Sequence, residues 1–147
     1  MDAYVIVGRP NTRKSTIMRS LTGIHNRGRR DIALLDGMRI EVYARVSSLQ
    51  ESRTTPSEFV REVSQQRCDA VAFCLWPDAN FQSPNDFPDA HSYLRMFRDA
   101  GWNIVRVAVL GQAVSEPSYP NVEFFPTSQS APVNQTAQGV RRHFGWF

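Results

Sequence analysis

Four short apolar runs along the chain have the character of strands. Residues 3–8, 69–77 and 103–111 are almost continuously apolar, and residues 121–125 form a shorter run of the same kind. Runs of this length without polar alternation are typical of strands covered on both faces of a sheet. We therefore expect strands at these four positions, with the run at 69–77 in the centre of the sheet.

Between these runs, apolar residues recur three and four positions apart, which is the spacing of amphipathic helices. Thr55 can cap a helix that starts at Pro56, and Gly101 can end the helix after it. Gly139 stands inside the last helix and lowers its expected stability by about 1 kcal/mol relative to alanine. The predicted helices cover residues 14–21, 56–67, 89–100 and 133–144.

A hairpin is predicted after the first helix. Residues 32–35 and 39–46 are both β-like, and the pair Asp36-Gly37 stands between them. An Asp-Gly pair at this position favours a tight turn because both residues tolerate positive φ. The two strands are expected to be antiparallel, and residues 24–30 before them are expected to form a polar, flexible loop.

The alternation of predicted strands and helices favours an α/β sheet covered on both faces. A length of 147 residues favours one domain over the whole chain, residues 1–147. Two long loops are expected. Residues 77–88 contain three prolines and two asparagines, and residues 112–120 form a proline-containing connection.

The composition is that of an ordinary globular protein, with 41% apolar and 21% charged residues. No apolar stretch approaches the roughly 18 residues of a membrane span, and MDAYVIVG lacks the basic flank of a secretory signal. Cys68 and Cys74 have no metal-binding spacing, and two cysteines make no disulfide framework. We expect a cytoplasmic protein without a membrane span.

Positive charge is concentrated in the first third of the chain. Residues 1–50 carry nine basic and four acidic side chains, whereas the remainder carries eight basic and ten acidic ones. The segment RGRR at 27–30 contributes to this excess. Such a distribution fits attraction of nucleotide phosphates or nucleic acid, and it fits equally a solvated basic face.

The segment VIVGRPNTRKST at 5–16 is the strongest candidate for chemistry. A phosphate-binding loop consists of glycine, four residues, glycine-lysine and then serine or threonine, between a strand and a helix. Gly8, Lys14 and Ser15 stand at the matching positions, and Arg13 replaces the second glycine. Lys14 is also the only lysine among 17 basic residues. Lysine thus occurs where a tight anion-binding loop prefers it to arginine.

We predict that backbone N–H groups and the Lys14 ammonium bind nucleotide phosphates here, and that the Ser15 hydroxyl ligates Mg²⁺. The predicted phosphate-binding residues are Gly8, Asn11, Thr12, Arg13, Lys14, Ser15 and Thr16. Arg13 is strained by roughly 1–2 kcal/mol if its φ is positive, and adds a second cation if its φ is negative. The alternative is an ordinary strand-to-helix turn with a solvated Lys14.

The order of the predicted elements resembles that of the small Ras-like GTPases over nearly the whole chain. The resemblance implies a three-layer P-loop NTPase fold: a mostly parallel central sheet with one antiparallel hairpin strand, and helices on both faces. In that family the strand after the hairpin turn ends in Asp-x-x-Gly-Gln. Aligned on the turn, Gln50 and the following Glu51 match the family. Val46 replaces the Mg²⁺-associated aspartate, and Leu49 replaces the glycine that senses the γ-phosphate.

The base-reading motifs of the family are altered. Its guanine-reading Asn-Lys-x-Asp is replaced by Leu110-Gly111-Gln112-Ala113. Position 113 therefore has no carboxylate to accept a hydrogen bond from guanine. Pro126-Thr127-Ser128-Gln129 is weakly similar to the family's Ser-Ala loop. The expected cofactor is therefore Mg²⁺ with either GTP or ATP.

The resemblance implies a catalytic role for Gln50, which would orient a water for hydrolysis, with Arg13, Arg29 or Arg30 compensating charge. The alternatives are an exposed loop glutamine and solvated surface arginines.

Aromatic residues gather in two further places. RRHFGWF at 141–147 could stack on a base or a partner, or dock on the chain's own sheet. Trp76, Phe81 and Phe87 could form a partner-binding patch around the 77–88 loop, or pack into the core.

Three functions remain open on the sequence alone. The first is a nucleoside triphosphate-binding protein, a slow or impaired NTPase acting as a switch or regulatory subunit, whose loops 24–30 and 47–55 respond to the γ-phosphate. The second is a pseudo-GTPase that serves as a non-catalytic protein-interaction subunit. The third is a small-molecule or nucleoside kinase, which requires an acidic base near the loop. We expect nucleotide binding with weak or absent turnover, and a protein partner by analogy.

Overall fold

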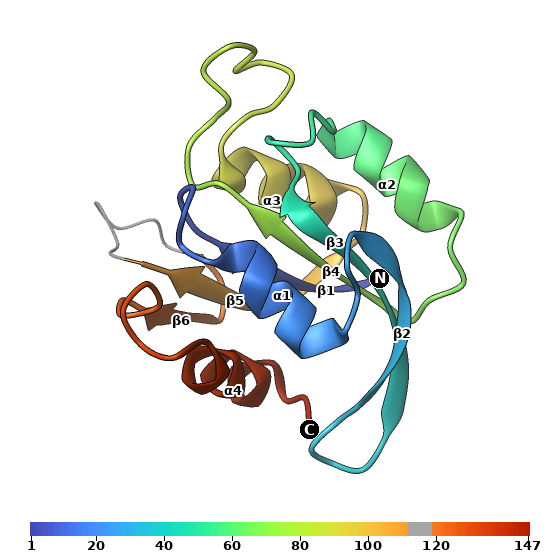
Figure 1. Cartoon of the computed structure of the whole chain (residues 1–147). Coiled ribbons are helices and arrows are strands. Elements are labelled where there is room, and N and C mark those ends of the chain that lie inside the picture. The colour runs from blue at the N-terminus through green and yellow to red at the C-terminus, as the bar shows by residue number, and fades with distance from the viewer. Residues whose placement is uncertain (112–118) are drawn as a thin grey trace.

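The central sheet contains six strands in the computed structural model, which describes residues 1–111 and 119–147. The strands are β1 (Asp2–Val7), β2 (Arg27–Ala33), β3 (Arg39–Ser48), β4 (Ala70–Leu75), β5 (Asn103–Leu110) and β6 (Val122–Phe125). Their spatial order is β2-β3-β4-β1-β5-β6 (Figure 1). Every neighbouring pair is parallel except β2 and β3. The predicted sheet, mostly parallel with one antiparallel hairpin strand, is confirmed.

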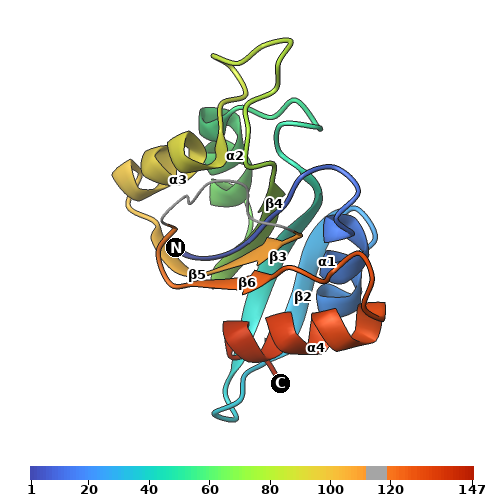
Figure 2. The same ribbon diagram turned by 90° about the vertical axis from the view of Figure 1, so that its left-hand side faces the viewer.

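In the described part of the chain, four helices cover the two faces of the sheet: α1 (Lys14–Thr22), α2 (Pro56–Ser64), α3 (Ala90–Asp99) and α4 (Val133–Phe144). The helices α1 and α4 lie on one face and α2 and α3 on the other, which gives three layers (Figure 2). Each face has its own apolar cluster, one containing Met18 and Phe144 and the other containing Phe59 and Phe97. The predicted α/β fold class is therefore confirmed.

The central strands are apolar on both faces because helices cover both. All six residues of β4 are buried, and β1 between β4 and β5 is buried from Ala3 onward. On the α2–α3 side, Phe73 of β4 makes edge contacts with Phe59 and Phe97 at ring-centroid distances of 5.2 Å. The continuous apolar runs of the sequence correspond to this double burial.

The hairpin extends further than the sequence predicted. Strand β2 begins at Arg27, so most of the segment 24–30 that was expected to be a flexible loop is strand, paired with β3 from Arg27 opposite Arg45. An edge strand needs only backbone pairing and leaves most side chains in water, so its polar sequence gives no apolar signal. Of the two turn residues, only Gly37 has positive φ, at 90°.

The helix termini follow local capping chemistry. Thr55 caps α2 in a reciprocal capping box with Glu58, and Pro56 occupies the first turn. The helix ends at Ser64, three residues before the predicted end, because the polar residues that follow offer no further apolar face. Helix α4 has the predicted bounds despite Gly139. A Cβ at Gly139 would lie 2.8 Å from Cε1 of Phe125, so this glycine lets α4 approach β6 closely.

The aromatic segments divide between core and surface. Phe144 and Trp146 pack against Tyr4 at centroid distances of 5.3 and 5.1 Å, so most of the C-terminal aromatics dock on the chain's own sheet. Phe87 is buried, whereas Phe81 is 88% exposed in the loop that projects between β4 and α3 (Figure 1). Core packing is therefore right for Phe87 and wrong for Phe81.

Residues 112–118, which include most of the predicted 112–120 loop and positions Gln112 and Ala113, lie outside the described residues. Over the part of the chain that is described, none of the helices has the length and apolar character needed to cross a membrane.

Candidate functional site

The loop at residues 8–13 joins β1 to α1 at the carboxyl end of the parallel strands. Its first residue is fixed to the neighbouring strand, because Gly8 N donates to the carbonyl oxygen of Leu75 at 3.0 Å. In open α/β sheets this edge, beyond the carboxyl ends of the strands, is where ligands bind. The predicted loop is thus in the position that a phosphate site requires.

Gly8 is required by the tight path of the loop. A Cβ at this position would lie 2.4 Å from Oγ1 of Thr12. That hydroxyl donates to the carbonyl oxygen of Arg9 at 2.7 Å, and Thr12 N donates to the same oxygen at 3.3 Å. Thr12 therefore bonds within the loop itself and is buried there.

Arg13 has a left-handed backbone, with φ 70° and ψ 25°. Of the two alternatives considered for this residue, the strained one is therefore correct, because a side chain costs roughly 1–2 kcal/mol in this region. The guanidinium Nη1 donates to the carbonyl oxygen of Ala131 at 3.0 Å. The loop is thus bonded through Arg13 to the segment that precedes α4.

Two substitutions of Arg13 separate its backbone strain from its side-chain contact. Arg13→Ala should lower the free energy of unfolding by about 1 kcal/mol, because it keeps the strain and loses the bond to Ala131. Arg13→Gly should be about 1 kcal/mol more stable than Arg13→Ala, because glycine tolerates positive φ. Urea unfolding of both variants measures the difference. A glycine variant no more stable than the alanine variant would contradict the strain.

Lys14 is buried in the wall of the site, with 7% of its surface exposed. Its Nζ donates to the carbonyl oxygen of Arg9 at 2.8 Å, which leaves further donors of the ammonium for a ligand. Burial lowers the pKa of Lys14, while the nearby Cys74 and Glu51 oppose that shift. The alternative of a merely solvated Lys14 is wrong in this structure.

The first turn of α1 presents unpaired donors. Within residues 1–111 and 119–147, the N–H groups of Lys14, Ser15 and Thr16 have no acceptor, and no side chain caps the helix. Such groups carry partial positive charge and favour an anion. A residue with left-handed backbone angles directly before a helix also helps to turn successive N–H groups toward one point.

A cavity of about 530 Å³ opens beside this turn. It brings together four of the predicted residues, namely Asn11, Arg13, Lys14 and Ser15. Pro10, Glu51 and Trp76 complete the wall. Glu51 and Trp76 were not predicted as site residues. Glu51 directly follows Gln50 of the aligned motif, and Trp76 directly follows the buried strand β4. These positions are the signals that could have identified them.

The other predicted residues do not line this cavity. Gly8 and Thr12 shape the loop from within, and Thr16 is exposed on α1. Arg29 and Arg30 also stand elsewhere, on β2, where their guanidinium groups donate to main-chain carbonyl oxygens of Arg67, Thr22 and Gly23.

Gln50 is fully buried, so its interpretation as an exposed loop glutamine is wrong. Its side-chain amide pairs with the main chain of Trp76: Trp76 N donates to Oε1 at 3.0 Å, and Nε2 donates to the Trp76 carbonyl at 2.9 Å. Nε2 also donates to the carbonyl oxygen of Pro88 at 3.1 Å. In this arrangement the amide holds the 49–55 segment to β4 and to the start of α3, and its donors are not directed at a substrate water.

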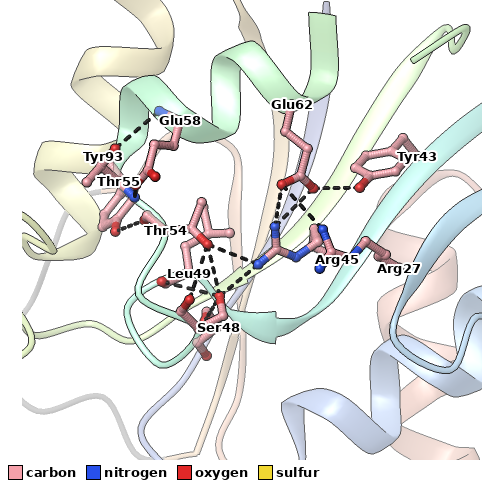
Figure 3. A network of polar contacts seen from close by, with 11 residues as sticks. Arg27, Tyr43, Arg45, Ser48, Leu49, Thr54, Thr55, Glu58, Glu62 and Tyr93 are labelled. Atoms are coloured by element: carbon pink, nitrogen blue, oxygen red, sulfur yellow. Dashed lines mark hydrogen bonds and ion pairs between the residues drawn. The ribbon is translucent and has the colours of Figure 1, made fainter. Parts of the chain in front are cut away.

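A second set of bonds fixes the same segment from the side of α2 (Figure 3). Arg45 of β3 donates to both carboxylate oxygens of Glu62 at 2.7 and 2.9 Å, and its other terminal nitrogen donates to the hydroxyls of Ser52 and Thr54. Tyr43 donates to Glu62 at 2.5 Å. Burial, followed by this hydrogen bond, raises the pKa of Tyr43 to about 12. The phenol therefore remains a donor at neutral pH.

A second cavity, of about 450 Å³, lies on the other side of the loop. It is lined by Arg9, Pro10, Thr12, Leu110, Pro126, Gln129 and Ser130. The segment 127–131 is bonded to the loop at two further points, since Ser128 Oγ donates to the Thr12 carbonyl and Gln129 Nε2 to the Asn11 carbonyl.

Metal ligands at the site are few. Among the described residues, no three His, Cys, Asp or Glu side chains gather where they could hold a metal ion. Ser15 and Glu51 are the hydroxyl and carboxylate among the side chains that line the first cavity. This donor set fits a cation such as Mg²⁺ that is bound mainly by phosphate oxygens and water, and does not fit an all-protein metal site.

The chain was compared with known proteins in three ways. A scan against protein-family models, a search of curated proteins and a search of solved structures each return no match.

Proposed function

We propose that the chain binds a nucleoside triphosphate, with the phosphates held by the loop at 8–16. The observation that carries the proposal is the position of Lys14, a buried residue that lines the first cavity together with Ser15. Among the described residues, the backbone N–H groups of both have no acceptor. A buried cation costs free energy unless an anion or dipole compensates it. A phosphate placed in the cavity would accept from the ammonium and the helix N-terminus together.

The second cavity supports a nucleotide over an isolated phosphate. Two cavities on opposite sides of residues 9–13 offer one space for phosphates and another for a base. The wall of the second cavity contains Leu110 and Pro126, apolar surfaces on which a base can pack, and the Gln129 amide, which can donate or accept. These groups do not favour guanine over adenine, so either ATP or GTP fits the proposal.

The surroundings of Gln50 favour binding with weak or absent turnover. Hydrolysis requires a group that orients the attacking water, and the Gln50 amide is bonded to main-chain groups instead. The same bonds oppose movement of residues 47–55 as a switch. This observation favours, as a second candidate, the non-catalytic interaction subunit, in which the nucleotide has a structural role.

Replacing Lys14 tests the proposal. Lys14→Met keeps most of the apolar stem and removes the charge, so the fold should remain intact while binding of ATP and GTP in the presence of Mg²⁺ is lost. Calorimetric titration measures the affinity, and circular dichroism checks the fold. Arg19→Ala, which removes a cation from the other end of α1, is the matched control and should bind as the parent does.

Two results would contradict the proposal. Unchanged binding by Lys14→Met would refute the role of the ammonium. Absence of heat with both nucleotides in the parent protein would refute nucleotide binding itself.

A further inference from the structure

Glu51 stands in a segment that is fixed on both sides. The residue before it, Gln50, is bonded to β4 through its side chain, and its carbonyl oxygen accepts from Asn80 Nδ2 at 3.1 Å. The residue after it, Ser52, donates its N–H to the carbonyl oxygen of Ser48 at 3.0 Å. The Cα of Glu51 therefore has little freedom, although its side chain is exposed.

The fixed position places a carboxylate in the wall of the first cavity, together with Lys14 and Ser15. The ion pairs of the described residues do not include one between Glu51 and Lys14, and Nζ of Lys14 bonds to the Arg9 carbonyl. A negative side chain in a cavity suited to phosphate is unfavourable unless a cation lies between the two.

Strand β3 offers no carboxylate beneath the cavity. Val46, which occupies the place of an acidic residue in the aligned motif, is buried in the apolar cluster under α1. The acidic side chain of the site thus comes from the loop after the strand. Mg²⁺ typically takes one or two protein oxygens and completes its octahedron with phosphate oxygens and water, and a hydroxyl with one carboxylate fits that demand.

We propose that Glu51 is the carboxylate ligand of a divalent cation that accompanies the bound triphosphate, with the Ser15 hydroxyl as the second protein ligand. The inference rests on the proposed nucleotide binding and goes further by assigning the acidic group of the metal site. The carboxylate interacts with the cation directly or through one of its waters, and without the cation it repels the phosphates.

This arrangement predicts that one substitution changes the affinity for ATP differently in the presence and in the absence of Mg²⁺. Glu51→Gln should weaken binding of ATP in the presence of Mg²⁺ by about tenfold, because a cation ligand is lost. In metal-free buffer with a chelator, the same variant should bind ATP as tightly as the parent or more tightly, because a repulsive charge is removed. Calorimetric titrations at constant ionic strength, repeated with GTP, measure both affinities.

Glu41→Gln is the matched control. Glu41 lies on β3 at the opposite end of the parallel strands, where its backbone pairs with Asp69, so both affinities should stay at parent values. A second readout comes from Mn²⁺ with ATP, because electron paramagnetic resonance measures free aqueous Mn²⁺ and gives the bound metal by difference. The parent complex should retain Mn²⁺ at concentrations where the Glu51→Gln complex has released it.

The outcomes distinguish the two proposals. If the parent binds neither nucleotide with or without metal, nucleotide binding and the metal ligand are both refuted. If the parent binds and Glu51→Gln strengthens or preserves affinity in both buffers, with Mn²⁺ retained, only the assignment of Glu51 is refuted.

Discussion

Replacing Glu62 with leucine should lower the free energy of unfolding by about 3–5 kcal/mol, one of the two largest effects expected in this chain. Its carboxylate accepts two of the hydrogen bonds that Arg45 donates and one from the hydroxyl of Tyr43. The side chains of Arg45 and Glu62 are only 8% and 20% exposed. Without the carboxylate, a nearly buried guanidinium loses its counter-charge, and such a charge is poorly solvated in the interior. Urea unfolding followed by tryptophan fluorescence measures the loss.

An exposed ion pair provides the control for Glu62. Arg39 and Asp31 approach to 2.6 Å, but their side chains are 59% and 53% exposed. Asp31→Asn should therefore change stability by only about 0.5 kcal/mol. The double variant Arg45→Met with Glu62→Leu should recover much of the loss, because an apolar pair replaces the ionic one. A Glu62→Leu effect no larger than that of Asp31→Asn would show that Arg45 finds other compensation.

Replacing Gln50 with leucine should lower the free energy of unfolding by about 3 kcal/mol, since it leaves partly buried main-chain groups of Trp76 and Pro88 without their partners. The size of the effect separates the two roles considered for this residue. A glutamine that only orients a water could be replaced with little change in stability. The measurement is again equilibrium unfolding, carried out without nucleotide.

Gln135→Leu is the matched control for Gln50, because it makes the same chemical change at an exposed position of α4. It should alter stability by less than about 0.5 kcal/mol. If both variants show the same small loss in free energy of unfolding, the Gln50 amide does not stabilise the fold in the way its bonds indicate.

Periodicity predicted the interior of the fold well and its edge poorly. The buried strands β1, β4 and β5 produced continuous apolar runs, and α4 showed its full helical pattern because its buried positions recur at 3.6-residue spacing. The first half of β2 was not predicted as a strand, because an edge strand whose arginines lie in water has no apolar pattern. Its pairing depends on β3, a partner that a local window does not contain.

The site was predictable only where its chemistry is local. The spacing of Gly8, Lys14 and Ser15 located the loop, because these residues lie within one short segment of the chain. Glu51 and Trp76 reach the same cavity from the segments that follow β3 and β4, so only the sheet order brings them there. The burial of Gln50 likewise depends on Trp76 and Pro88, 26 and 38 residues away.

The bonds between the loop at 8–13 and the segment 127–131 bear on when the loop reaches its final shape during synthesis. Arg13, Thr12 and Asn11 each hold partners 116 to 118 positions further along the chain. Ribosomes add residues in the direction from the N-terminus to the C-terminus, so residues 11–13 emerge long before these partners do. The nascent chain therefore forms these three bonds only after residues 127–131 have been synthesised.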